Sequence, residues 1–278
     1  MNKSTRYAFK LFYIGDRYLG FQKQKNGMTV QGRIFKALKK VKIFENIEDL
    51  NFGYSSRTDK YVHSVGQVIA FNTSKKIILP EINDNLPNDI KFYGYTETSS
   101  DFKARYLAKY RHYKYVSFRE NLDIDLMNKG AKKFTGVHDF RILSKSPHPI
   151  KTSREIYDIK IQKINDNIIS IDVFGRSFMR EMVRRIASVL LDLGERKLHI
   201  NDIEKYFYPE NKNKIKVRAA PIKDGGELIL YNCEYGLKFK FIEYSMYKIK
   251  KFLWKRIRDR YASLYANKSL FNYFNQIE

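Results

Sequence analysis

The chain has 278 residues, of which 43% are hydrophobic, so it is long enough for two modest domains and is not a disordered chain. Its 53 Lys and Arg against 30 Asp and Glu give a net charge of +23, which favours a polyanionic partner, although a generally lysine-rich proteome would also explain it. A single cysteine excludes an intrachain disulfide, and the lack of an 18-residue apolar run or a signal-peptide pattern predicts a cytoplasmic protein that crosses no membrane.

The first hundred residues predict the order strand, helix, strand, strand. Residues 7–13 alternate with the period of two that is typical of a strand. Thr29 is placed to cap a following helix. The apolar positions of that helix recur at helical spacing: Val30, Ile34, Leu38 and Val41. With two further strands at 67–72 and 91–95, this segment predicts an α+β layer with one face of its sheet left free.

After a connector at 101–109 the same order recurs. The predicted elements are a strand at 112–118, a helix capped by Asp123 or Asp125, a hairpin of 156–161 with 168–174, a helix at 178–193 and a strand at 227–231. The chain is therefore predicted to hold two α+β halves, residues 1–105 and 106–236, whose sheets lie side by side and form a cleft.

Residues 237–278 have a different character. Apolar residues keep helical spacing, and residues 238–260 hold nine Lys and Arg against two acids. One interpretation is a terminal helix packed by its apolar stripe with a solvated basic face. In another, the basic face also contacts an RNA backbone. An interfacial membrane helix fits less well, because aromatic residues occur on both faces.

The stretch from Arg57 to His63 places an acid, Asp59, between a strong base and a histidine. Two apolar runs flank it, so the carboxylate is expected on a short, well-positioned segment. Such an acid usually caps a turn or pairs with its neighbouring arginine. In a protein this basic it is also a candidate for chemistry on a polyanion.

Several short segments, taken together and in order, resemble the TruA-type tRNA pseudouridine synthases. They are residues 13–22, Val30-Gln31, Arg57-Thr58-Asp59, Val62-His63, Leu86-Pro87-Asn88-Asp89-Ile90, Phe102-Lys103-Ala104-Arg105, Arg111-His112-Tyr113-Lys114-Tyr115, His138-Asp139-Phe140, Thr152-Ser153-Arg154, Phe178, Met182-Val183-Arg184 and Ala220-Pro221. The resemblance covers roughly residues 6–233.

The resemblance implies a fold and an activity. The fold is α+β, with two RRM-like halves whose antiparallel sheets merge around a basic cleft and are flanked by helices, here with a C-terminal helical extension. The activity is that of a cofactor-free isomerase that converts uridine to pseudouridine in tRNA, typically at positions 38 to 40 of the anticodon stem. Such enzymes commonly act as homodimers.

Three residues match catalytic positions of the family. Asp59 matches its catalytic aspartate, which serves either by attacking C1′ or by taking the C2′ proton. Either role requires an ionised carboxylate, so a nearby cation is expected to hold the pKa of Asp59 low. Arg184 resembles that ion-pair partner. Tyr113 resembles the tyrosine that stacks on the target uracil, and its phenol is a candidate for helping to remove the C5 proton.

Four further residues are expected to bind substrate. Arg57 resembles the arginine that holds the flipped nucleotide or fills its place, and phosphate pairing is an equally physical role for it. Lys60, Arg105 and Arg154 are candidate contacts to the RNA backbone. Thr58 and His63 are interpreted as support for the turn.

The sequence departs from the bacterial pattern around Asp59. Ser56 replaces a glycine, and Lys60-Tyr61 replaces Ala-Gly, which together with the basic C-terminal helix resembles the archaeal and eukaryotic branches. Those branches include enzymes with other uridine targets, so a broader-specificity synthase is the main alternative. A non-catalytic tRNA-binding module would not need Asp59, Tyr113 and Arg184 together, and a metal nuclease would need clustered ligands that the sequence lacks.

Overall fold

The computed structural model describes residues 4–145 and 151–276. The strands are β1 (Thr5–Tyr13), β2 (Gly53–Tyr54), β3 (His63–Thr73), β4 (Ile90–Thr98), β5 (Tyr110–Phe118), β6 (Gly136–Asp139), β7 (Ser153–Asn165), β8 (Ile168–Gly175), β9 (Gly226–Glu234) and β10 (Lys240–Phe241). The helices are α1 (Val30–Lys40), α2 (Leu79–Asp84), α3 (Ile124–Lys132), α4 (Met182–Gly194) and α5 (Glu243–Asn275). Short 3-10 turns are η1 (Gly15–Arg17), η2 (Ile47–Leu50), η3 (Ile200–Phe207) and η4 (Pro209–Asn213).

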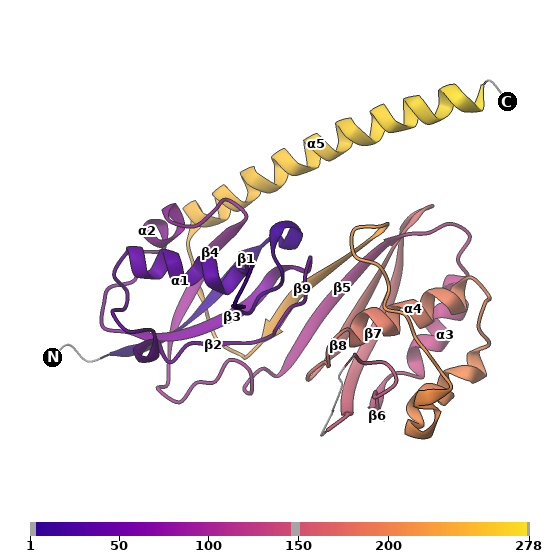
Figure 1. Ribbon diagram of the computed structural model, residues 1–278, viewed down its shortest axis with the longest axis horizontal. Coiled ribbons are helices and arrows are strands. Elements are labelled where there is room, and N and C mark those ends of the chain that lie inside the picture. The colour runs from indigo at the N-terminus through magenta and orange to yellow at the C-terminus, as the bar shows by residue number, and fades with distance from the viewer. Residues whose placement is uncertain (1–3, 146–150, 277–278) are drawn as a thin grey trace.

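The strands form a ten-stranded sheet in which two halves lie side by side (Figure 1). Each half runs strand, helix, strand, strand, helix, strand along the chain, and the second half has β6 as an additional strand at the edge of the sheet, between α3 and β7 in the sequence. In the first half the spatial order is β4-β1-β3-β2, and in the second it is β9-β5-β8-β7, so both halves place their equivalent strands in the same order. The prediction of two RRM-like α+β halves with merged sheets is confirmed.

The halves join where β3 pairs with β9. This pairing is parallel and short, with His63 opposite Ile229 and Ser64 opposite Leu230. The two-residue strand β2 pairs farther along the same edge of β3 and leaves its beginning free for β9. At this seam Gly66 lies so close to β9 that an added Cβ would be 2.4 Å from the Cα of Asn232. The loop 55–62, between β2 and β3, therefore emerges where the two halves meet.

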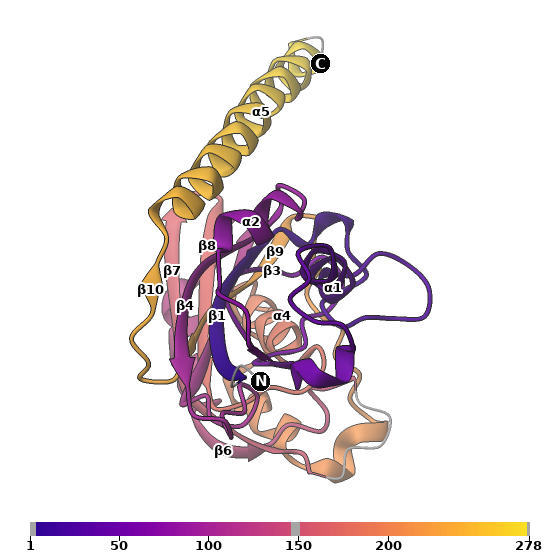
Figure 2. The ribbon, with the colours of Figure 1, turned by 90° about the vertical axis from the view of Figure 1, so that its left-hand side faces the viewer.

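Helices α1 and α4 lie on the same face of the sheet (Figure 2). The expected apolar stripe of α1 is buried, with Ile34 and Leu38 packed in one cluster with Phe9 and Phe71 of the sheet. The expected N-cap of α1 is also present, because the hydroxyl of Thr29 accepts a hydrogen bond from the backbone N–H of Gly32.

The expectation of a free sheet face in the first half is wrong. Ala8 and Val68 point away from α1 and are buried in one cluster with Phe102 and Ala104 of the connector. The connector has no helical or strand periodicity, so no pattern in its residues indicates that it covers the sheet.

Helix α5 contacts the body through its first half. Its buried residue within the described part of the chain is Ser245, and the ring of Phe252 meets Phe12 at a centroid distance of 6.2 Å. Arg256 Nη2 lies 2.9 Å from Asp16 Oδ2, and Arg260 lies 3.8 Å from Asp16. These two ion pairs fix α5 to η1.

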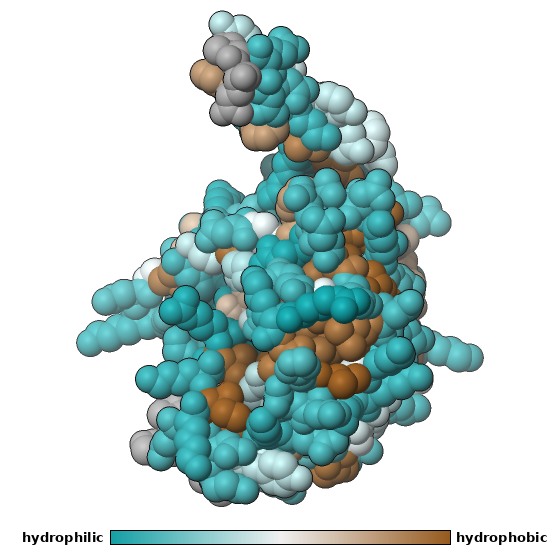
Figure 3. Space-filling view, turned by 90° about the vertical axis from the view of Figure 1, so that its right-hand side faces the viewer, coloured by the Kyte–Doolittle hydropathy of each residue, from teal (hydrophilic) through white to brown (hydrophobic). Residues whose placement is uncertain are grey.

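Beyond Arg260 the helix projects away from the body (Figures 1 and 2). The side chains of Leu264 and Phe271 are 47% and 66% exposed. Pale and brown side chains accordingly stand clear of the teal body along α5 in Figure 3. The interpretation of a helix packed along its whole apolar stripe is therefore wrong for the second half of α5. Among the described residues, none of the helices combines the length and apolar character needed to span a bilayer.

Replacing Gly66 with Ala should destabilise the protein by about 1–3 kcal/mol, because the new Cβ would force β3 and β9 apart at the seam. The measurement is the free energy of unfolding from urea denaturation. Gly53→Ala is the matched control, since a Cβ there would meet the end of the Arg6 side chain at an ordinary 3.5 Å. Equal effects of the two substitutions would contradict this description of the seam.

Candidate active site

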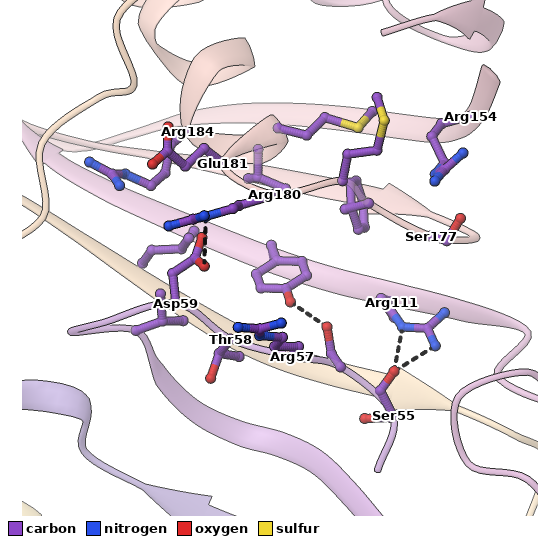
Figure 4. A pocket seen from close by; sticks show the side chains of 18 of the residues that line it. Ser55, Arg57, Thr58, Asp59, Arg111, Arg154, Ser177, Arg180, Glu181 and Arg184 are labelled. Carbon is purple, nitrogen blue, oxygen red and sulfur yellow. Dashed lines mark hydrogen bonds and ion pairs between the residues drawn. The ribbon is translucent and has the colours of Figure 1, made fainter. Parts of the chain in front are cut away.

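A cavity of about 870 Å³ lies between the loop 55–62, strand β5 and the start of α4 (Figure 4). A second hollow of about 670 Å³ adjoins it, and both are lined by Asp59. The acidic side chains that line the first cavity are Asp59 and Glu181. Its cationic lining residues are Arg57, Arg105, Arg111, Lys145, Lys151, Arg154, Arg180 and Arg184. The predicted basic cleft is therefore present, with Asp59 between its two parts.

The segment 13–21 holds the loop that carries Asp59. The hydroxyls of Tyr13 and Thr58 share a hydrogen bond of 2.7 Å, and the backbone N–H of Phe21 donates to the carbonyl of Thr58. Gly15 lies directly against the loop, where an added Cβ would be 2.3 Å from the carbonyl oxygen of Val62. Glycine is required there because no side chain fits, and this contact fixes the end of the loop.

His63 connects the same loop to η1 and to β9. The backbone N–H of Gly15 donates to its Nδ1, at 2.9 Å, so Nε2 carries the proton and donates to Glu227, also at 2.9 Å. Arg260 of α5 lies 3.7 Å from the other carboxylate oxygen of Glu227. With both ring nitrogens engaged in the scaffold, this geometry fits the interpretation of His63 as support.

Asp59 lies against the N-terminus of α4. Its Oδ1 is 3.9 Å from Nε of Arg180, and 33% of its side chain is exposed. The backbone N–H of Glu181, the N-cap residue of α4, also acts to lower the pKa of Asp59, as the smallest of the named influences. The positive end of the helix dipole and the guanidinium therefore both favour a negative charge at this position.

Burial nevertheless raises the pKa of Asp59 above its ordinary value. The charge of Arg180 acts in the opposite direction, the carboxylate of Glu181 adds to the rise, and the charge of Arg184 lowers the pKa to a lesser degree. The expectation that a cation would hold this pKa low is therefore wrong for the free protein, because desolvation outweighs the attraction.

The structure pairs Asp59 with Arg180 rather than with Arg184. The Nε of Arg184 donates to the carbonyl of Ala220 at 2.7 Å, and Figure 4 shows an ion pair from Asp59 to Arg180 and none to Arg184. The reason is local, since Glu181 has a left-handed backbone, with φ of +60°, and α4 begins only at Met182. Arg180 is thereby outside the helix and reaches over Asp59.

Tyr113 lies beside this group on β5. Its hydroxyl and that of Ser56 are 2.7 Å apart, its ring meets Phe178 edge-on, and its side chain is buried. Burial raises the pKa of the Tyr113 phenol well above its usual range, so the phenol is neutral at physiological pH. Ser56, which departs from the bacterial pattern, therefore supplies the hydrogen-bond partner of this tyrosine.

The four expected substrate-binding residues all line the cleft. Arg57 is exposed and borders both hollows, whereas Lys60 borders the second. Arg105 and Arg154 line the first cavity together, and burial and then the charge of Arg105 lower the pKa of Arg154. Like charges held this close favour an anion between them.

The sequence reasoning missed Arg111 as a structural residue. Its guanidinium is buried and donates to the carbonyls of Ser55, Arg105 and Arg176, so it ties together three segments around the cleft. Its place two residues before Tyr113 was the available signal. Its three acceptors come from segments whose proximity the sequence did not reveal.

Within residues 4–145 and 151–276, no group of three or more His, Cys, Asp and Glu side chains is arranged to hold a metal ion.

Comparison with known proteins shows the family. The sequence model of a family described as tRNA pseudouridine synthase matches residues 131–236. A tRNA pseudouridine synthase A of Methanosphaera stadtmanae is 34% identical over 90% of this chain and 92% of its own length. Another, of Methanobrevibacter smithii, is 32% identical over 98% of each chain. The chain belongs to the tRNA pseudouridine synthase family, a class of isomerases.

Among solved structures, one described as a Cbf5-Nop10-Gar1 complex aligns with 67% of this chain and 54% of that chain. The sequence identity is 14% and the TM-score 0.32, which is too low to carry an argument.

Replacing Arg180 with Met should move the acid limb of the kcat/KM profile for uridine conversion to higher pH. The guanidinium favours the ionised form of Asp59, so its loss raises the pKa of Asp59 further and leaves less of the active form. We expect kcat/KM to fall roughly tenfold on the acid limb of the profile, and less at higher pH, where Asp59 is ionised in both proteins. Arg180→Lys keeps the charge and is the control, and an acid limb that does not move in Arg180→Met would contradict the pairing.

Proposed function

We propose that this protein converts uridine to pseudouridine at positions 38 to 40 of the tRNA anticodon stem, with Asp59 as the catalytic carboxylate. The observation that carries the proposal is the position of Asp59. It lies at the seam of the two halves, within a cationic cleft, and beside Tyr113, Arg180 and Arg184. The choice of positions 38 to 40 rests on the resemblance described above.

The reaction is an isomerisation in which the N1–C1′ bond breaks, the base turns, and a C5–C1′ bond forms. C5 loses a proton and N1 gains one, so the product has the composition of the substrate. Asp59 serves either as a nucleophile at C1′, leaving again when C5 attacks, or as the base that takes and returns the C2′ proton. In both roles its partial burial helps, because a poorly solvated carboxylate is more reactive.

Tyr113 is proposed to bind the target uracil after the base has left the helical stack. Its ring faces the cavity, and its hydroxyl is oriented by Ser56. Because burial keeps the phenol neutral, we assign to it stacking and hydrogen bonding to the base rather than removal of the C5 proton.

The cations are proposed to bind the RNA backbone. Arg57 fills the place of the flipped nucleotide or pairs with a phosphate, and Lys60, Arg105 and Arg154 contact phosphates along the cleft. Arg184 supplies a second positive charge near Asp59 and remains a proposed catalytic residue. A broader-specificity synthase is the alternative, supported by the changed residues Ser56, Lys60 and Tyr61 around Asp59.

We also propose a cytoplasmic homodimer built from units 1–105, 106–236 and 237–278, with α5 as the contact between copies. Exposed side chains on α5 recur at alternating spacings of three and four, the pattern of helices that pack on one another. They are Trp254, Ile257, Tyr261, Leu264, Lys268 and Phe271. Residues 261–275 carry one charge, that of Lys268, whereas residues 243–260 are strongly basic. An antiparallel pair would place each basic half beside a nearly neutral half, which limits repulsion.

The conversion is tested by mapping pseudouridine in unmodified tRNA transcripts treated with the protein. We expect product at positions 38 to 40 with the wild-type protein. Asp59→Asn should lower the rate at least about a hundredfold while tRNA binding persists, because the carboxylate takes part in bond breaking. Asp49→Asn, at an exposed acid of η2, is the control. Product at other positions would overturn the specificity, and no product anywhere would overturn the activity.

The dimer is tested by measuring molar mass in solution by light scattering. Leu264→Glu should convert a dimer to a monomer, because it places a charge in the apolar stripe of α5. Ser263→Glu, one residue away on another side of the helix, should leave the mass unchanged. A monomeric wild-type protein, or equal effects of the two substitutions, would contradict the proposed contact.

A further inference from the structure

Strained backbone gathers at the second hollow. In the described part of the chain, seven residues other than glycine have a positive φ, and three of these lie at this hollow or directly beside it. They are Tyr61 at +69°, Glu181 at +60° and Lys223 at +86°. A bulky side chain in this conformation costs on the order of 1 kcal/mol, and such residues tend to occur at functional sites.

Two of the strained residues contact one another across two loops. The Nζ of Lys223 lies 4.1 Å from the centroid of the Tyr61 ring, and the Nζ of Lys60 lies 4.5 Å from it. Lys223 belongs to the tight turn before β9, where its backbone N–H donates to the carbonyl of Gly226. Two ammonium groups are therefore held over one aromatic ring. Lys60 comes from the loop of the first half, and Lys223 comes from the turn that leads into β9.

The backbone at Tyr61 is imposed by its neighbours. An added Cβ on Gly15 would lie 2.6 Å from the carbonyl carbon of Tyr61, and the N–H of Val62 donates to the carbonyl of Asp59. A glycine at position 61 would adopt this conformation without strain. The tyrosine therefore carries a backbone strain that a glycine would avoid, although its partly buried ring packs against the core. A ligand for the exposed part of the ring gives a further reason for an aromatic residue at this position.

We propose that Lys60, Tyr61 and Lys223 form a binding site for the RNA strand next to the target uridine. When RNA binds, the Tyr61 ring stacks on an unpaired base. The two ammonium groups then leave the face of the ring and pair with the flanking phosphates. The hollow bordered by Lys60 and Tyr61 is also lined by Asp59, so a strand whose uridine reaches Asp59 passes this group. The inference rests on the proposed function, because it takes the substrate to be tRNA.

The first test separates binding from stability with Tyr61→Gly. We expect the dissociation constant for an unmodified tRNA transcript to rise about 5- to 100-fold, the range for loss of one base–aromatic stack. The urea midpoint should change little, because relief of the backbone strain offsets the lost packing of the ring. Lys42→Gly, at a residue with φ of +55° after α1, is the matched control and should leave tRNA affinity unchanged.

The second test uses the salt dependence of binding. Lys60→Gln and Lys223→Gln should each lower the slope of log K against log salt by about 0.7–0.9, the value for one lost phosphate contact. Lys75→Gln, at an exposed lysine after β3, should leave the slope unchanged.

The inference is overturned if Tyr61→Gly lowers the urea midpoint with unchanged tRNA affinity, or if the slopes of the two lysine variants match the wild type. A wild-type protein that binds tRNA at this site without forming pseudouridine would instead overturn the proposed activity alone.

Discussion

The short parallel pairing of β3 with β9 determines where the candidate active site lies. Because β2 pairs with only part of one edge of β3, the rest of that edge is free to pair with β9, the first strand of the second half's sheet at the seam. The loop 55–62 leaves the sheet at that point, so Asp59 faces β5 and α4 of the other half. A carboxylate from one half thus lies beside a tyrosine and arginines from the other, and the merged sheet fixes their positions relative to one another.

The electrostatics of the cleft place opposing demands on Asp59. Its ionised form is disfavoured by burial and favoured by Arg180 and the N-terminus of α4. Burial prevails in the free protein and raises the pKa of Asp59, so the ionised carboxylate lowers stability. Strained backbone at Tyr61, Glu181 and Lys223 surrounds it. The free-energy costs of the buried carboxylate and of the strained backbone are concentrated around the loop 55–62. The buried hydrophobic clusters of the two halves offset these costs.

Local patterns predicted much of this structure. Periodicity located most of the strands and the long helices, Thr29 was recognised as a cap, and ordered motifs brought Asp59 and Tyr113 into one site. Contacts between distant segments were not predictable. The arginine over Asp59 depends on the left-handed backbone of Glu181, and Lys223 meets Tyr61 only because two loops converge at the seam. The exposed end of α5 was missed because its apolar spacing is the same for a packed and a projecting helix.

The fold partly buries the carboxylate of Asp59, so its ionised form costs stability. The most direct measurement is the free energy of unfolding of the wild-type protein and Asp59→Asn as a function of pH. A raised pKa in the folded state means that the protonated carboxyl costs nothing at low pH, whereas the ionised group lowers stability above the folded pKa. The asparagine variant should therefore be the more stable protein at neutral pH, and the difference should shrink as the pH falls below the raised folded pKa of Asp59 and be gone below the ordinary pKa of aspartate. A variant that is less stable than the wild type at neutral pH would contradict the account.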